Sequence, residues 1–183
     1  MLFRSIIRIY FKTYDQSDYA SIKEQDYEVF NRKDLLQILN KYEIDNDIFN
    51  DFRNRMNEIQ ESVDSYKILP LDKWQWNSWI GFYMELQQIL EDGSWGYVAN
   101  QRGGFLGFWW NFIEKDGITM HLQIETEQGQ GSVGDEIVFN RGKLCFKIRV
   151  DDESKRTDYR WKLYSYILEE SKKHNILVKK PDR

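Results

Sequence analysis

Two short stretches place carboxylates next to a lysine, a spacing that some Mg²⁺-dependent hydrolytic sites use. They are DDESK, with Asp151, Asp152, Glu153 and Lys155, and ESK, with Glu170 and Lys172. In such sites the carboxylates hold the metal and the lysine orients or activates water, which requires a rigid, mostly apolar strand inside a cleft. DDESK is hydrophilic throughout, and ESK falls in an exposed predicted helix. We therefore interpret both as surface sequence and predict no catalytic residue and no metal ligand in this chain.

Acidic residues on one predicted strand face basic residues on the next. The stretch HLQIETE alternates so that His121, Gln123, Glu125 and Glu127 share a face, and CFKIRVD does the same for Lys147, Arg149 and Asp151. One interpretation makes Glu125 a metal ligand and Lys147 a catalytic base. The other is a set of ordinary surface ion pairs, each worth about 1 kcal/mol or less. We favour the surface pairs.

The aromatic stretch GGFLGFWW, residues 103–110, is the third candidate. On an extended strand one face carries only apolar side chains and is predicted to be core: Leu106, Phe108, Trp110 and Phe112. On the other face Gly107 leaves a notch between Phe105 and Trp109 that a planar ring can enter. Arg102 adds a cation beside an aromatic plane, as in base stacking. Core packing is the competing interpretation and the one we favour. If the stretch binds a nucleic acid or a protein, the residues are Arg102, Phe105, Trp109, Lys147 and Arg149.

Composition limits the class of protein. The chain has 183 residues, 16% aromatic residues including seven tryptophans, and a net charge of −4, which indicates a folded chain with its own core and no general basic coat for nucleic acid. A single cysteine excludes an internal disulfide and suits a reducing compartment. No stretch approaches the roughly 18 apolar residues of a membrane span, so we expect a cytoplasmic protein with no membrane partner.

Periodicity predicts an α+β fold. A strand over residues 6–12 is followed by a polar loop and a short strand in YEVFN, and Asn31 is expected to cap the first helix. Asp45 or Asn46 is expected to cap a long amphipathic helix, and a third helix covers residues 73–91. After Gly93 the period changes to two, which predicts antiparallel strands, and then come a helix over residues 156–174 and a strand-like NILVKK.

Several stretches together resemble a known family: IYFKTYDQSDY, YEVFNRKDLLQIL, residues 51–90, WGYVANQRGGFLGFWWNF, LQIE and KLCFKIRV. They are similar, in the same order, to the downstream half of bacterial proteins of the PD-(D/E)xK nuclease superfamily. The resemblance implies a Mg²⁺-dependent cleft that cuts phosphodiester bonds in DNA. The family's acidic strand and E-x-K strand are expected upstream of residue 1, so no catalytic residue and no metal or other cofactor is assigned within this chain.

The resemblance also sets the expected organisation. Residues 1–68 are predicted to be the remnant of a nuclease-like core, and residues 69–183 an accessory domain with a helix, antiparallel strands and a packed helix. On this interpretation the chain is the C-terminal portion of a nuclease-like protein and is inactive alone, with DNA or a protein as partner. The alternative is a non-enzymatic module that binds protein or nucleic acid through the aromatic strand at residues 103–112.

Overall fold

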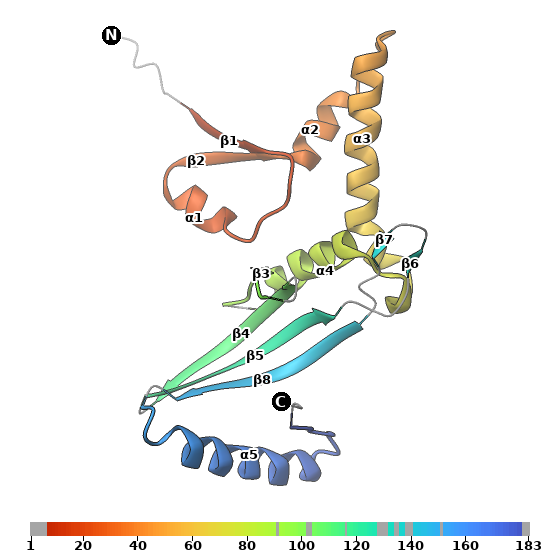
Figure 1. The fold of residues 1–183 in the computed structure, drawn as a ribbon. Helices are drawn as coiled ribbons and strands as arrows, with labels where there is room; N and C mark the ends of the chain where they lie inside the picture. The colour runs from red at the N-terminus through yellow and green to blue at the C-terminus, as the bar shows by residue number, and fades with distance from the viewer. Residues whose placement is uncertain are drawn as a thin grey trace, which may run out of the picture.

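A computed structural model of the chain describes residues 7–90, 92–101, 104–115, 117–127, 132–133, 136–137, 141–150 and 152–180. The fold mixes helices with an antiparallel sheet in its C-terminal half, which confirms the predicted α+β class. Helices α2 (Arg32–Leu39) and α3 (Asp47–Asp64) and a small β unit lie on one side of helix α4 (Trp76–Ile89), and the sheet and helix α5 (Arg156–Lys173) lie on the other (Figure 1). Helix α4 contacts both parts, since it packs on α3 and on strands β3 (Ser94–Val98) and β4 (Phe105–Lys115).

The first unit is a parallel pair of strands, β1 (Arg8–Lys12) and β2 (Tyr27–Asn31). Parallel strands need a crossover, and here it contains a short helix, α1 (Tyr19–Glu24), where the sequence predicted only a loop up to residue 21. This helix has no buried residue. Its sequence therefore lacks the apolar periodicity from which a helix is predicted. The two-stranded sheet has no third strand among the described residues.

Both predicted helix caps form. In α2 (Arg32–Leu39) the Asn31 side chain accepts hydrogen bonds from the N–H groups of Lys33 and Asp34, and the Asp34 carboxylate accepts one from the Asn31 N–H at 2.9 Å. In α3 (Asp47–Asp64) Asn46 accepts from the Phe49 N–H at 2.9 Å. The apolar stripe of α3 is covered only in part, because Met56 and Val63 are buried whereas Ile48 and Phe52 are exposed.

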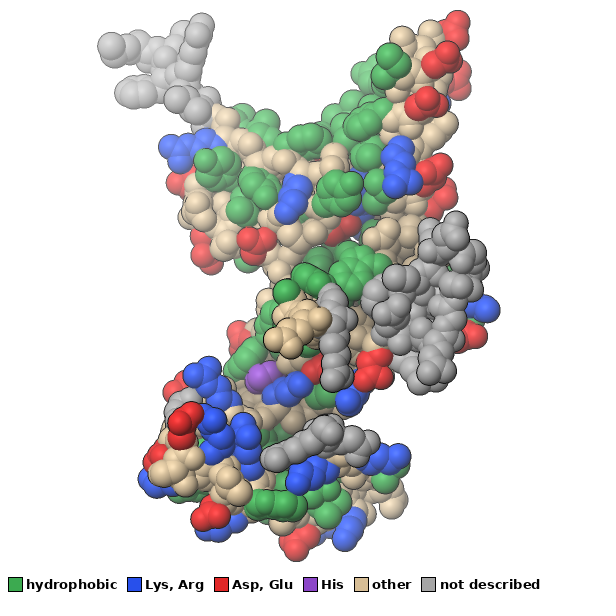
Figure 2. Space-filling model, in the orientation of Figure 1, with side chains coloured by type: hydrophobic (Ala, Val, Ile, Leu, Met, Phe, Trp, Pro, Cys, Tyr) green, Lys and Arg blue, Asp and Glu red, His purple; other side chains and the backbone are tan. Residues whose placement is uncertain are grey.

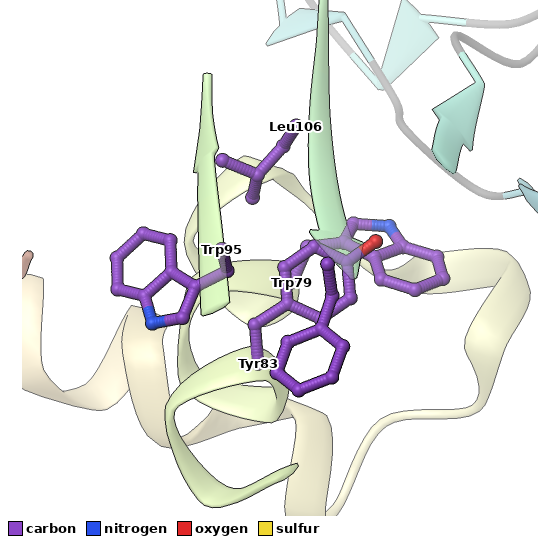
Figure 3. Close-up of a cluster of buried hydrophobic side chains, with 5 residues drawn as sticks. Trp79, Tyr83, Trp95 and Leu106 are labelled. Atoms are coloured by element: carbon purple, nitrogen blue, oxygen red, sulfur yellow. The ribbon is translucent and has the colours of Figure 1, made fainter. Parts of the chain in front are cut away.

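Two short 3₁₀ turns, Ser65–Lys67 and Leu71–Lys73, lead into α4 (Trp76–Ile89). The helix therefore begins at Trp76, later than the predicted residue 73. At its start the Gln75 N–H donates a hydrogen bond to the Ser78 hydroxyl at 3.0 Å. Its inner face and the first strands of the sheet build the main aromatic core (Figure 3). The buried members of this core are Trp79, Tyr83, Trp95, Leu106 and Phe108.

The large sheet has the strand order β3-β4-β5-β8 and is antiparallel throughout. Its strands are β3 (Ser94–Val98), β4 (Phe105–Lys115), β5 (Ile118–Glu127) and β8 (Arg141–Val150). Strands β6 (Ser132–Val133) and β7 (Glu136–Ile137) pair with each other. Helix α5 (Arg156–Lys173) contacts the sheet through β8. The strand-like stretch at residues 175–180 forms no strand, so that prediction is wrong.

Candidate functional site

Four of the five residues proposed from the sequence share one face of the large sheet, which we call the polar sheet face. Phe105 and Trp109 of β4 point to it, because both rings lie close to the side on which Gly107 would carry a Cβ. Lys147 points to it, because it pairs with Glu125, the residue opposite Gly107. Arg149 points to the same face, because it lies two residues after Lys147 on β8 and side chains alternate along a strand. Arg102 lies outside the described residues.

The charges on the polar sheet face are paired with one another. The Lys147 ammonium forms an ion pair with Glu125, and Lys143 Nζ lies 3.6 Å from Glu127 Oε1. Glu125 also accepts a hydrogen bond from Gln123 Nε2 at 2.9 Å, and Gln123 Oε1 lies 3.3 Å from His121 Nε2. The Lys147–Glu125 contact confirms one of the predicted ion pairs. Glu125 thus neutralises Lys147, and Glu127 lies beside Lys143, so these described charges offset one another.

Cys145 lies between these pairs on β8 and is half-buried. Burial and the nearby Glu125 carboxylate raise the pKa of its thiol, although Lys147 and Lys143 act in the opposite direction. A thiol with a raised pKa stays protonated at neutral pH and is a poor nucleophile. The polar sheet face therefore lacks an activated cysteine.

The notch at Gly107 is filled from within the chain. A Cβ at Gly107 would lie 3.1 Å from the Phe105 ring and 3.2 Å from the Trp109 ring, so the two aromatic side chains close over the glycine. The Trp109 ring also covers Gly96 on β3, at 3.6 Å from the position of its missing Cβ. Aromatic rings that cover glycines on neighbouring strands stabilise the sheet. This supports core packing rather than an open slot for a base.

Phe112 is not a core residue, contrary to the sequence-based prediction. Strand β4 carries a bulge after Trp110, where Asn111 adopts a φ of 57° and the register shifts. The extra residue reverses the alternation, so that Phe112 is 51% exposed and stacks on His121, with ring centroids 5.0 Å apart. The predicted apolar face is therefore buried at Leu106 and Phe108 and ends at the bulge.

The acid and lysine sequences form exposed local pairs. Lys155 Nζ lies 3.2 Å from Asp152 Oδ2, and Arg156 pairs with Glu153 at 3.2 Å, both in the turn that starts α5. At the other end of the helix Glu170 pairs with Lys173 at 2.6 Å rather than with Lys172. Asp151 lies outside the described residues. Within the part of the chain that the structure describes, no three metal-ligating side chains converge.

A cavity of about 300 Å³ lies between the end of α3 and α4. Two polar pairs lie in its wall: the Tyr66 hydroxyl donates to Glu85, and Lys67 Nζ lies 3.0 Å from Asp64 Oδ1. Burial alone would raise the pKa of Asp64, but hydrogen bonds from Gln60 and Lys67 outweigh it and lower that pKa. The Tyr66–Glu85 hydrogen bond joins the turn after α3 to α4. We therefore interpret the cavity as part of the contact between these two helices.

A second, smaller pocket lies on α5 and was not predicted from the sequence. It has a volume of about 100 Å³, and we call it the α5 pocket; it is lined by Thr157, Arg160, Trp161, Tyr164 and Lys180. The segment after α5 turns back at Asn175, which has a φ of 55°, and brings Lys180 Nζ to 3.8 Å from the centroid of the Trp161 ring. The pocket residues on α5 recur at steps of three and four, so the sequence places them on one helix face. Lys180 reaches this face only because the chain reverses at Asn175.

Comparison of the chain with protein-family models, with curated proteins and with solved structures finds no match. None of the helices in the described part of the chain combines the length and the apolar content that a membrane crossing requires.

Proposed function

We propose that this chain is the C-terminal, non-catalytic portion of a PD-(D/E)xK nuclease-like protein that acts on DNA. In this proposal residues 1–68 belong to a larger central sheet, and residues 69–183 form an accessory domain. The polar sheet face is then a supporting surface and not the reaction centre, because its ionic groups are paired and its glycine notch is filled.

The observation that carries the proposal is the parallel pair of β1 and β2. Parallel strands are usually buried on both faces within larger sheets, and a two-stranded sheet is marginally stable alone. Here Ile9 is 61% exposed and Phe11 is 53% exposed, although both belong to a strand of alternating apolar residues. A strand of this composition is expected to have further strands or a helix against it, as the core strand of a nuclease-like sheet would.

The first test is the coding DNA directly upstream of the codon for Met1. The proposal expects a segment there that encodes an acidic residue and then an E-x-K strand, in frame or in an adjacent reading frame. Coexpression of that segment with this chain is expected to give Mg²⁺-dependent cleavage of plasmid DNA. An upstream sequence without these residues, or a coexpressed pair that leaves DNA uncut, would count against the proposal.

The second test uses the purified chain alone with Mg²⁺ or Mn²⁺. Supercoiled plasmid and single-stranded DNA should remain uncut, because Asp152, Glu153 and Lys155 are engaged in exposed local pairs. Metal-dependent cleavage that is abolished by Glu153→Ala or Lys155→Ala would show that DDESK is a catalytic motif after all. Cleavage that survives both substitutions and stays with the chain through purification would place catalysis at other residues and would also count against the proposal.

Protein binding through the sheet is a second candidate function, and one observation favours it. On the face opposite the polar sheet face, Leu144 and Phe146 of β8 are 68% and 44% exposed. Exposed apolar side chains on adjacent positions of one face mark interaction surfaces. Leu144→Asp is expected to abolish capture of a protein partner by the immobilised chain, whereas the matched control Lys143→Asp, on the polar sheet face, should retain it. Equal capture by both variants would exclude this surface.

A further inference from the structure

Positive charge is concentrated at the C-terminal end of an otherwise acidic chain. Residues 152–180 contain eight Lys and Arg residues and five Asp and Glu residues, a net charge of +3, whereas the whole chain carries −4. Basic side chains gather over the lower part of the molecule in Figure 2, where Figure 1 draws α5. A local basic surface on an acidic protein directs polyanions to one place.

The α5 pocket lies within this basic region and offers hydrogen-bond donors without a carboxylate. Arg160 and Lys180 contribute two cationic groups, Thr157 and Tyr164 contribute hydroxyls, and Trp161 contributes an indole ring with its N–H. No acidic side chain of the described residues forms an ion pair with Arg160 or Lys180. A guanidinium beside an ammonium and two hydroxyls matches a phosphate group, which accepts several charge-assisted hydrogen bonds.

Aromatic side chains beside the pocket point to a nucleic acid rather than to a free anion. Trp161 is 53% exposed although it lines the pocket, and Tyr166 is exposed farther along the same helix. Tyr164 meets Trp161 edge-to-face, with ring centroids 6.1 Å apart, which fixes the indole orientation. Exposed aromatic rings next to cations are the surfaces on which unpaired bases stack.

We propose that the α5 pocket binds single-stranded nucleic acid, with a phosphate between Arg160 and Lys180 and a base stacked on the face of the Trp161 ring opposite the Lys180 ammonium. The small volume of the pocket suits a phosphate group, and the base lies outside it on the exposed indole. A duplex is disfavoured because its base faces are already stacked and hidden. This inference goes beyond the proposed function, since it concerns α5 alone and does not depend on the origin of the β1–β2 pair.

The test measures binding of a fluorescein-labelled oligothymidylate of about 20 nucleotides, longer than a typical site of about 4–16 nucleotides, by fluorescence anisotropy. Its duplex with oligoadenylate is the comparison ligand. Trp161→Ala is expected to weaken binding of the single strand about tenfold or more, since stacking on one aromatic side chain contributes that much. The salt dependence should stay unchanged, because no charge is removed.

The double variant Arg160→Ala/Lys180→Ala is expected to reduce the slope of log K against log salt concentration by about 0.7, because the two cations contact one phosphate. The matched control is Lys23→Ala/Arg55→Ala, which removes two exposed cations from α1 and α3. The control should leave both affinity and slope close to those of the unmodified chain. Circular dichroism melting curves check that every variant is folded.

The inference would be overturned by absence of binding at low salt, by an equal loss in the control and in Arg160→Ala/Lys180→Ala, or by unchanged binding after Trp161→Ala. Tighter binding of the duplex than of the single strand would also overturn it. These outcomes are separate from the upstream-sequence test of the proposed function. The chain can fail that test and still bind single strands through α5, or pass it and show no binding here.

Discussion

Arg32 Nη2 lies 2.6 Å from Asp15 Oδ2; the Arg32 side chain is buried, at 2% exposure, and that of Asp15 is mostly covered, at 11%. The same guanidinium donates to the Thr13 carbonyl oxygen at 2.8 Å and to Gln60 Oε1 at 3.1 Å. Arg32 is the first residue of α2, and its side chain thus joins this helix to the crossover after β1 and to α3. One buried guanidinium therefore fixes the positions of the crossover, α2 and α3 relative to one another.

Removal of this cation is expected to destabilise the N-terminal unit. Arg32→Ala leaves Asp15 as an unpaired buried charge, so we expect the free energy of unfolding to fall by about 3–5 kcal/mol. The matched control is Arg55→Ala, because Arg55 pairs with Glu58 on the exposed surface of α3 and is expected to contribute about 0–1 kcal/mol. Urea unfolding followed by circular dichroism measures both. Similar losses in the two variants would contradict the role assigned to Arg32.

Gly81 provides a test of the contact between α3 and α4. In an exposed helix Gly→Ala stabilises by about 1 kcal/mol, but a Cβ at Gly81 would overlap the backbone carbonyl oxygen of Val63 and lie 2.8 Å from the Tyr66 ring. We therefore expect Gly81→Ala to lower the free energy of unfolding, by about 1–3 kcal/mol. Gly96→Ala is the control, since its Cβ would meet Trp109 at an ordinary 3.6 Å. A stabilised Gly81→Ala variant would contradict the close approach of the two helices.

The sequence predicts features that depend on neighbouring residues and misses those that depend on distant ones. The Asn31 cap was predictable because Asn31 and Asp34 carry the whole signal in four residues. Phe112 was assigned to the core because alternation assumes an unbroken register, and the bulge at Asn111 interrupts it. The α5 pocket was missed because Lys180 reaches Trp161 only after the chain reverses at Asn175.

The bulge itself predicts a residue-specific effect at Asn111. Because its φ is 57°, a β-branched residue there is strained, and Asn111→Val is expected to lower the free energy of unfolding by about 1–2 kcal/mol. Asn111→Gly should stay within about 0.5 kcal/mol of the unmodified chain, since glycine adopts this conformation readily. Glu114→Val is the control, because it places valine at an exposed, extended position of β4, where valine should be tolerated. If Asn111→Val is as stable as Glu114→Val in urea unfolding, the bulge is absent.

Tyr19 predicts a loss of stability at alkaline pH. Burial, followed by the negative charge of Asp15, raises the pKa of its phenol from 10.0 to about 12. The folded chain then binds the proton more tightly than the unfolded chain, so this stabilisation is complete below pH 10 and is lost as the pH rises through about 12. Tyr19→Phe is expected to make the fall between these pH values shallower. Ultraviolet titration of the phenolates at 295 nm should lose one step near pH 12, and an unchanged titration curve would contradict the assignment.

The β1–β2 pair predicts uneven protection from hydrogen exchange. Strand β5 lies between two partners in the large sheet, whereas β1 pairs only with β2 among the described strands and exposes Ile9 and Phe11. Local opening of a two-stranded sheet requires little free energy. Mass spectrometry should therefore find that amides of Arg8–Lys12 exchange orders of magnitude faster than those of Ile118–Glu127 in the chain alone. If a nuclease-like segment completes the sheet, its addition must slow exchange in β1 and leave β5 unchanged. Slow exchange of β1 in the chain alone would mean that the pair is stable without further strands, and the proposed function would lose the observation that carries it.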